Sequence, residues 1–342
     1  MIKVQNIYYM LAYAFRFLKN DGTAHVDTES FDHAEDLYAA LLVLSVSKQI
    51  KRGITKDYLL HTELLSSPRG RIDVSDSIKE RALFKKQLIC KTDEYTENTK
   101  LNQIIKTAFE HLIKSKNVQT KRKKEMKKLI NHFQHVNVVN LNSVNWKAIQ
   151  YNRSNVTYRM IISICEFIAK GILFSSQAGQ EKHSQFIDDQ TMHKLYEKFV
   201  LSYYQKHYPS LRPSASQIDW QIDSGDKKFL PVMKSDITLQ KGEKIIIIDT
   251  KYYQYSMQKH YLSNRRTLHS NNLYQIYTYV KNKDKYQTGL VSGILLYAKT
   301  EEETVPNEDY KMDGNVISVK TIDLNANFSV IQKQLNNIAE KL

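Results

Sequence analysis

Apolar residues recur at helical spacing through most of the first half of the chain. This periodicity predicts helices over residues 6–19, 35–52 and 98–114. Between the last two, the sequence SSPRG at residues 66–70 predicts a turn, and the alternating residues after it favour short strands or an extended hairpin within residues 59–92. We therefore expect an N-terminal helical domain that carries a β-hairpin or a small β-sheet insertion.

The second half of the chain has a different order of patterns. A strongly apolar helix over residues 156–174 precedes the polar connector SSQAGQEKHSQ, after which we expect a helix over 189–206, strands over 229–239 and 244–253, a helix over 271–280 and a strand over 289–298. Such an order predicts a mixed α/β (α+β) sheet domain. We place the boundary between residues 150 and 190 and divide the chain into residues 1–155 and 156–342.

The amino-acid composition indicates which partners and which cellular compartment the protein is suited to. The 342 residues include 50 Lys and Arg against 36 Asp and Glu, a formal net charge of +14, which favours polyanions such as nucleic acids. Two cysteines, Cys90 and Cys165, are too few for a disulfide framework or a cysteine-based zinc site. The apolar run at residues 7–15 lacks a signal-peptide cleavage pattern, and no stretch has the length that spans a bilayer. We therefore expect a soluble cytoplasmic protein with no membrane partner.

The most specific chemical pattern follows the four isoleucines of residues 245–248. This apolar strand runs directly into Asp249, Thr250 and Lys251, and charges at the end of a buried strand are costly unless they are paired or bind a metal. Because side chains alternate along a strand, Asp249 and Lys251 share one face, and Asp236 on the preceding strand can reach the same end of the sheet. Two carboxylates beside a lysine form a hard, oxygen-rich site suited to Mg²⁺.

Three other positions in the chain carry the same Asp/Glu-x-Lys spacing, so only the strand context selects Asp249. The alternative interpretation is a surface salt bridge at the end of a strand. Glu197, on the helix before the hairpin, could complete the metal shell or could be an ordinary exposed glutamate. Gln275 and Tyr279 share a face of a later helix at i, i+4 spacing, where they could line the site or simply pack.

A basic run extends from Lys114 to Lys128, with eight basic residues and only Glu125 of opposite charge. Its densest part supplies four candidates for contact with DNA or a partner: Lys121, Arg122, Lys123 and Lys124. Cations near DNA gain affinity by releasing counterions. The run is equally compatible with a solvated helix face, and the sequence alone does not decide between the two.

The hairpin PVMKSDITL…IIIIDTKYY resembles the core of the PD-(D/E)XK nucleases, and the whole chain resembles the McrC family, the nuclease subunits of modified-cytosine restriction systems. Ser235 stands where the nuclease motif has its proline. The matching segments keep the family's order: VQNIYYMLAYAF at 4–15, RGRID at 69–73, DEYTENTKLNQIIK at 93–106, LYEKFVLSYY at 195–204, SDITL at 235–239, IIDTKYY at 247–253 and NLYQIYTYV at 272–280.

This resemblance implies more than the residues do by themselves. It implies that Asp236 and Asp249 are metal ligands, that Lys251 is the catalytic lysine, and that Glu197 and Gln275 belong to the nuclease core; the Thr250 carbonyl would be a further ligand. It also implies that residues 1–155 dock on McrB, an AAA+ GTPase hexamer that recognises double-stranded methylated DNA, and that residues 156–342 form the nuclease domain.

Arg69 and Arg71, beside Gly70, are candidates for the contact with this partner, although a plain turn with two solvated arginines explains them equally well. The chain contains no G-x-x-x-x-G-K-[ST] loop, so GTP would be bound by the partner and not by this chain.

The sequence therefore favours a Mg²⁺-dependent DNA endonuclease subunit of a GTP-dependent, methylcytosine-directed restriction complex. Two other functions are compatible with the same residues. One is a stand-alone PD-(D/E)XK endonuclease that needs no GTPase. The other is a basic adaptor that holds DNA or a ring partner and has an inert nuclease core.

Overall fold

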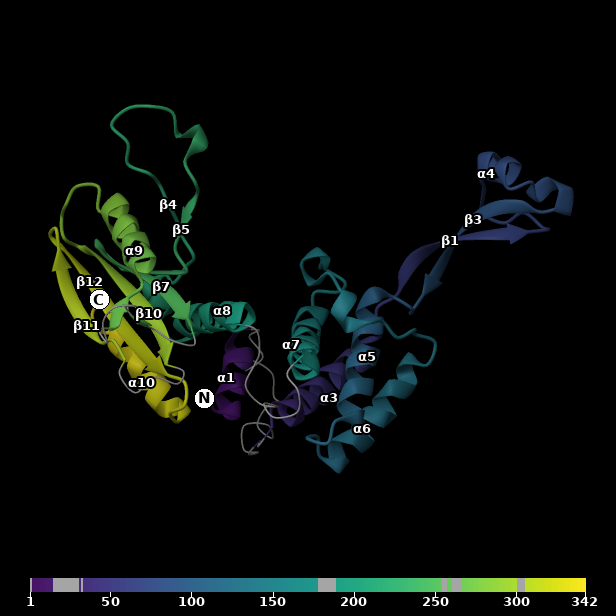
Figure 1. The fold of residues 1–342 in the computed structure, drawn as a ribbon, viewed down its shortest axis with the longest axis horizontal. Coiled ribbons are helices and arrows are strands. Elements are labelled where there is room, and N and C mark those ends of the chain that lie inside the picture. The colour runs from purple at the N-terminus through teal and green to yellow at the C-terminus, as the bar shows by residue number, and fades with distance from the viewer. Residues whose placement is uncertain are drawn as a thin grey trace. The chain divides into compact units, whose positions relative to one another are not determined.

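The computed structural model describes residues 2–14, 31, 33–177, 189–253, 257–259, 266–299 and 305–342 (Figure 1). The chain forms two compact units, one made of residues 1–32 and 177–342 and the other of residues 33–176. These units do not follow a division at residue 155, because the helix after that residue belongs to the second unit and the N-terminal residues belong to the first. The expected mixed α+β fold is confirmed.

The unit of residues 33–176 has a helical body. Among the described residues it contains four α-helices: α3 (Ala34–Arg52), α5 (Lys100–Lys114), α6 (Thr120–Ile130) and α7 (Tyr158–Gln177). Helices α3, α5 and α6 pack on one another. The helices α3 and α5 correspond to the ones predicted from the sequence. Helix α5 begins at Thr99, whose side chain accepts from the backbone N–H of Asn102, and α3 ends at Gly53, whose φ of 96° suits glycine. Short 3-10 turns follow α6: η3 (Asn131–Phe133), η4 (Leu141–Ser143) and η5 (Trp146–Ala148).

A β-arm projects from this helical body (Figure 1). Its strands β1 (Asp57–Leu65) and β3 (Leu88–Thr96) are antiparallel along their whole length, and the short β2 (Arg71–Ile72) pairs with the other edge of β3. The predicted strands are thereby confirmed. The sequence did not predict the two helical turns between them, α4 (Val74–Lys79) and η2 (Ala82–Lys85).

The unit with the two chain ends is built on a five-stranded sheet of order β11-β12-β10-β7-β6. The three central strands are parallel, and β6 and β11 are antiparallel edge strands: β6 (Ile237–Lys241), β7 (Lys244–Tyr252), β10 (Val291–Lys299), β11 (Glu308–Met312) and β12 (Asn315–Asp323). Helix α9 (Ser270–Lys283) covers one face, and α8 (Asp189–His207) and α10 (Phe328–Ala339) lie on the other. Helix α1 (Val4–Ala14) packs against α8.

One predicted strand of this unit is not continuous. Residues 229–239, predicted as a single strand, contain the end of a 3-10 turn, the short strand β5 and the start of the edge strand β6. The remaining short elements are η6 (Pro209–Leu211), η7 (Lys227–Phe229), and the pairs β4 (Gln217–Ile218) with β5 (Met233–Lys234) and β8 (Met257–Lys259) with β9 (Arg266–Leu268).

Two sequence predictions fall partly outside the described residues. The predicted helix over residues 6–19 is helical as far as Ala14, and residues 15–19 are not described. Most of the polar connector after residue 177 is not described either. Within the described ranges, no helix has the length and apolar character needed to cross a membrane.

Candidate active site

Strand β7 carries the polar residues of the candidate site at the end of an apolar run. It lies between β10 and β6 in the sheet, and Ile246, Ile247 and Ile248 are buried. Asp249, Thr250 and Lys251 are also buried, with exposed fractions of 1%, 0% and 8%. Charged groups at such low exposure need partners or a bound ion, as expected from the sequence.

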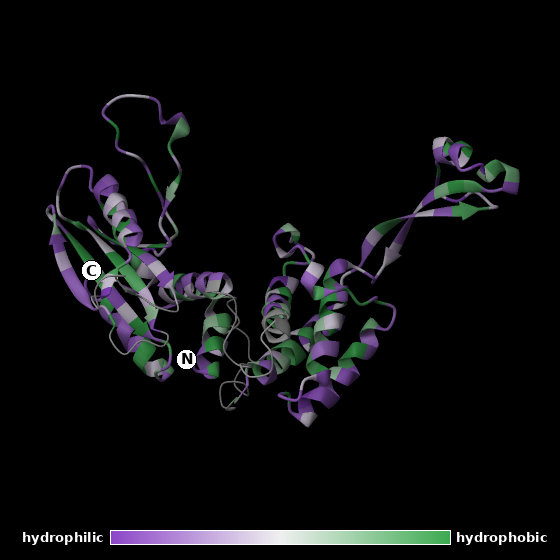
Figure 2. Ribbon diagram, in the orientation of Figure 1, coloured by the Kyte–Doolittle hydropathy of each residue, from purple (hydrophilic) through white to green (hydrophobic). Residues whose placement is uncertain are grey.

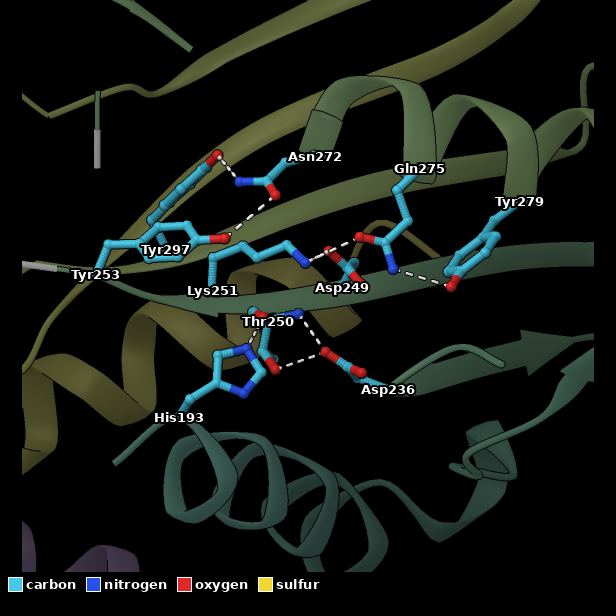
Figure 3. A network of polar contacts seen from close by, with 10 residues as sticks. All are labelled: His193, Asp236, Asp249, Thr250, Lys251, Tyr253, Asn272, Gln275, Tyr279 and Tyr297. Carbon is cyan, nitrogen blue, oxygen red and sulfur yellow. Dashed lines mark hydrogen bonds and ion pairs between the residues drawn. The ribbon is translucent and has the colours of Figure 1, made fainter. Parts of the chain in front are cut away.

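The alternation along β7 places Asp249 and Lys251 on one face, as predicted, and this face is the one that helix α9 covers. The Lys251 ammonium lies 2.7 Å from Oδ2 of Asp249 and donates to Oε1 of Gln275 on α9 at 3.0 Å (Figure 3). The Gln275 amide in turn donates to the Tyr279 hydroxyl at 2.9 Å. The two helix residues whose role the sequence left open are therefore part of one polar chain with Lys251.

Asp236 approaches β7 from the neighbouring strand. The register pairs Ile237 with Ile248, so Asp236, one residue earlier, reaches the level of Asp249. Its Oδ2 accepts two hydrogen bonds from Thr250, one from the backbone N–H and one from the hydroxyl, both at 2.7 Å. Figure 3 shows the Asp236 carboxylate on the Thr250 side of the strand and the Lys251 side chain on the side of α9. The two aspartates thus flank β7 at the point where its pairing with β6 ends.

The Asp249 carboxylate combines burial with an incomplete set of partners. Burial and the neighbouring Asp236 carboxylate together raise the pKa of Asp249 to about 6, against the opposing effect of Lys251. Burial also opposes the charge on Lys251, but the Asp249 carboxylate outweighs it and raises the lysine pKa. Oδ2 of Asp249 is buried and contacts the Lys251 ammonium at 2.7 Å, and the described residues offer it no further hydrogen-bond donor.

Glu197 on α8 is a third carboxylate within electrostatic reach. Burial raises its pKa to about 7, and Asp236 and Asp249 raise it as well, against Lys234 and Lys194. Neighbouring carboxylates repel one another when they are ionised, and a cation bound between them would relieve this repulsion. In the part of the chain that is described, however, no three His, Cys, Asp or Glu side chains are gathered closely enough to form a ready-made metal site.

Sequence reasoning missed His193, one turn before Glu197 on α8. Its Nε2 lies 2.9 Å from the carbonyl oxygen of Thr250, and because a carbonyl only accepts, this nitrogen must carry the proton. The i, i+4 spacing of His193 and Glu197 on the helix before the hairpin was the available signal. A second missed group joins α9 to the sheet, where Asn272 contacts the hydroxyls of Tyr253 and Tyr297 at 3.2 and 3.0 Å.

The oxygen atoms around the end of β7 fit Mg²⁺. The ion prefers hard oxygen ligands and is commonly held by only one or two carboxylates, with water and phosphate completing its shell. Asp249 offers a buried carboxylate whose Oδ2 contacts only the Lys251 ammonium among the described residues, and Asp236 uses only Oδ2 for Thr250. Asp236 and Asp249 are thus the two carboxylates that would hold such an ion, and both interact electrostatically with Glu197.

The candidates for partner contact lie in the other unit. Arg69 and Arg71 are exposed on the β-arm, and on α6 Lys121 and Lys124 are exposed and Lys123 is half-buried. Arg122 corrects an expectation, because it is 5% exposed and lies 3.5 Å from the buried Asp36 carboxylate. An arginine that faces the interior cannot contact DNA or a partner.

Comparison with known proteins assigns the family. The family model described as "McrBC 5-methylcytosine restriction system component" matches residues 3–298. A relative from Escherichia coli (strain K12), described as the type IV methyl-directed restriction enzyme EcoKMcrBC, is 27% identical over 349 residues, which cover 100% of this chain and 98% of the relative.

Two solved structures are also similar, both of McrBC assemblies from Thermococcus gammatolerans. A half-complex of McrB AAA+ hexamers with bound McrC matches with a TM-score of 0.48 and 17% identity, covering 98% of this chain and 76% of that one. A cryo-EM structure of the McrBC complex matches with a TM-score of 0.42 and 16% identity, covering 59% of this chain and 58% of that one. On the family match, which spans most of its length, the chain belongs to the McrBC 5-methylcytosine restriction system components.

Proposed function

We propose that this chain is the nuclease subunit of a GTP-dependent, methylcytosine-directed restriction complex, and that it hydrolyses DNA phosphodiester bonds with Mg²⁺ at a PD-(D/E)XK-type site. The observation that carries the proposal is the arrangement of the half-buried Asp236 and the buried Asp249 and Lys251 around the end of β7. A structural salt bridge would require only Asp249 and Lys251. The second carboxylate, Asp236, precedes the adjacent strand and raises the pKa of Asp249, so more negative charge is gathered here than one salt bridge needs.

Each residue has a distinct part in this reaction. Asp236, Asp249 and the Thr250 carbonyl would hold the cation, with Glu197 nearby to complete its shell. A bound Mg²⁺ supplies positive charge that polarises the scissile phosphate and lowers the pKa of a bound water. Lys251 is held by Asp249 and Gln275, so that its ammonium can orient the attacking water or stabilise the charge that develops on the phosphate.

We propose further that the partner is an McrB-like AAA+ GTPase hexamer, that it binds GTP and reads double-stranded methylated DNA, and that the complex acts in the cytoplasm. The β-arm supports a docking role, because it exposes many large apolar side chains: Tyr58, Leu60, Leu64, Ile72, Val74, Ile78, Leu83, Phe84 and Tyr95. Figure 2 shows hydrophobic segments along this arm. Exposed apolar surface of this kind marks protein-binding sites. Arg69 and Arg71 lie on the same arm.

The test is cleavage of a duplex that carries methylated cytosines, with Mg²⁺, by the purified chain alone and together with the GTPase and GTP. We expect the wild type to cleave only in the complete mixture. Asp249→Ala should not cleave, while it folds and still stimulates GTP hydrolysis by the partner. Full cleavage by a folded Asp249→Ala protein contradicts the site, and cleavage by the chain alone would favour a stand-alone endonuclease.

A further inference from the structure

After its first residue, Thr120, the exposed residues of α6 are all lysines. Lys121, Lys124, Lys127 and Lys128 are exposed, and we call them the α6 lysine face. At 3.6 residues per turn they occupy one side of the helix, opposite the buried Arg122 and Met126. The one acidic residue of the helix, Glu125, is half-buried. The basic run that the sequence singled out therefore divides into a buried structural side and a solvent side of uniform charge.

The buried side fixes which residues face the solvent. One terminal nitrogen of Arg122 donates to Oε1 of Gln119 at 2.9 Å and lies 3.5 Å from Oδ2 of Asp36, while the Gln119 backbone N–H donates to Oδ1 of Asp36 at 3.0 Å. Met126 is fully buried one turn later. Because these contacts hold α6 against α3, the helix cannot rotate its lysines inward.

This arrangement is unfavourable for an isolated chain. Lysines at i, i+3 and i, i+4 spacing repel one another. The first turn of α6 holds basic residues and no acidic one, so cations lie at the positive end of the helix dipole. None of the four lysines of the α6 lysine face lies within ion-pair distance of a carboxylate among the described residues. Solvated helix faces commonly carry charges of both signs, whereas the exposed charges of α6 are all positive.

We propose that the α6 lysine face binds the phosphate backbone of double-stranded DNA. This proposal rests on the function proposed above, because it names a surface that would hold the DNA substrate. From Lys121 to Lys128 the helix rises about 10 Å, a length over which one strand of the duplex passes about three phosphates. The unit that carries this face contains none of the three candidate catalytic residues. Backbone contacts of this kind position a duplex without reading its sequence, so the face takes methylated and unmethylated DNA alike.

The test measures duplex binding by the full chain over a range of salt concentrations, in EDTA so that no cleavage occurs. One variant changes all four lysines of the α6 lysine face to glutamine. Its matched control removes the same charge from exposed lysines of the sheet unit: Lys241→Gln, Lys244→Gln, Lys283→Gln and Lys285→Gln. We expect the face variant to lose at least about tenfold in affinity at 0.1 M salt and to lower the slope of log K against log salt by about 3. The control should change both far less.

The same variant separates this proposal from a loss of folding and from the nuclease assignment. Removing the mutual repulsion should leave its melting temperature at or above that of the wild type. Three results overturn the proposal: no duplex binding by the wild type at low salt, equal losses in the face variant and the control, or unchanged DNA binding with lost assembly on the GTPase, which would assign the face to an acidic protein surface. Because binding is measured without metal, an inactive nuclease site would leave this result intact.

Discussion

The ammonium of Lys251 lies 2.7 Å from Oδ2 of Asp249, two residues earlier on the same strand. Both side chains are buried, and the lysine reaches a second acceptor, Gln275, on helix α9. The hydrogen bond from Lys251 to Gln275 therefore joins the centre of the sheet to the helix that covers it. In the proposed reaction this contact keeps a positive charge at a fixed place beside the metal-binding carboxylates.

Gln275 should affect the rate of DNA cleavage by holding the Lys251 ammonium in place. Gln275→Leu removes the acceptor that holds the ammonium, so we expect the cleavage rate of the complex to fall about 10- to 100-fold, as with residues that orient a metal site from outside it. Tyr279→Phe is the matched control, since it leaves the Gln275 carbonyl free to accept from Lys251, and its loss should be smaller. Wild-type cleavage by Gln275→Leu in single-turnover assays would show that this contact is only structural.

The raised pKa of Glu197 predicts a pH dependence of stability in the metal-free chain. Burial, with the two aspartates, raises this pKa from 4.5 to about 7 on folding, so the folded chain binds the proton more tightly than the unfolded one. The contribution of Glu197 is therefore fully present below about pH 4.5, is lost as the pH rises to about 7, and stays lost above it.

Urea unfolding in EDTA from pH 4.5 to 8 measures this effect. Glu197→Gln cannot titrate, so its free energy of unfolding should gain on that of the wild type as the pH rises through this window. A constant difference between the two proteins across the window would mean that the carboxylate titrates alike in both states.

Gly293 lets helix α9 approach strand β10 closely. A Cβ at this position would lie 2.7 Å from side-chain atoms of both Ile276 and Val280. We expect Gly293→Ala to destabilise the chain by about 1–3 kcal/mol, the usual cost of overfilling a packed core. In a double-mutant cycle measured by denaturant unfolding, Val280→Ala should recover part of that loss. Simple additivity of the two changes would indicate that the helix shifts without strain.

The buried pair of Arg122 and Asp36 should stabilise the helical unit. Arg122→Met leaves the Asp36 carboxylate buried with its backbone donor at Gln119 and no opposite charge, so we expect a loss of about 3 kcal/mol in the free energy of unfolding. Lys124→Met, at an exposed position of the same helix, should change stability by no more than about 0.5 kcal/mol. Equal stability of the two variants would place Arg122 outside the core.

The parts of the site that follow from local patterns were predictable from the sequence. Four isoleucines predict a buried strand, the alternation of side chains places Asp249 and Lys251 on one face, and the turn at residues 241–243 brings Asp236 alongside. The same reasoning located helix α9 and the i, i+4 pair of Gln275 and Tyr279, although it could not show that the pair contacts Lys251. That contact depends on how α9 packs on the sheet.

Features that depend on tertiary packing were missed or misjudged. The contact of His193 with the Thr250 carbonyl exists only because α8 crosses the sheet at that point. Arg122 looked like its basic neighbours, since its partner Asp36 is 86 positions away in the sequence. The apolar Val118 and Met126, four residues before and after Arg122, were the local signs that it faces inward. Two apolar residues in a basic run are too weak a pattern to predict a buried face.

The central claim is that Asp236 and Asp249 together hold a divalent cation, and calorimetric titration of the purified chain with Mg²⁺ and Mn²⁺ tests it most directly. We predict a saturable site in the wild type that is lost or strongly weakened in both Asp236→Ala and Asp249→Ala, while Asp309→Ala, on the edge strand β11, binds like the wild type. Equal metal binding by the wild type and both aspartate variants would contradict the account and leave the chain an inert adaptor.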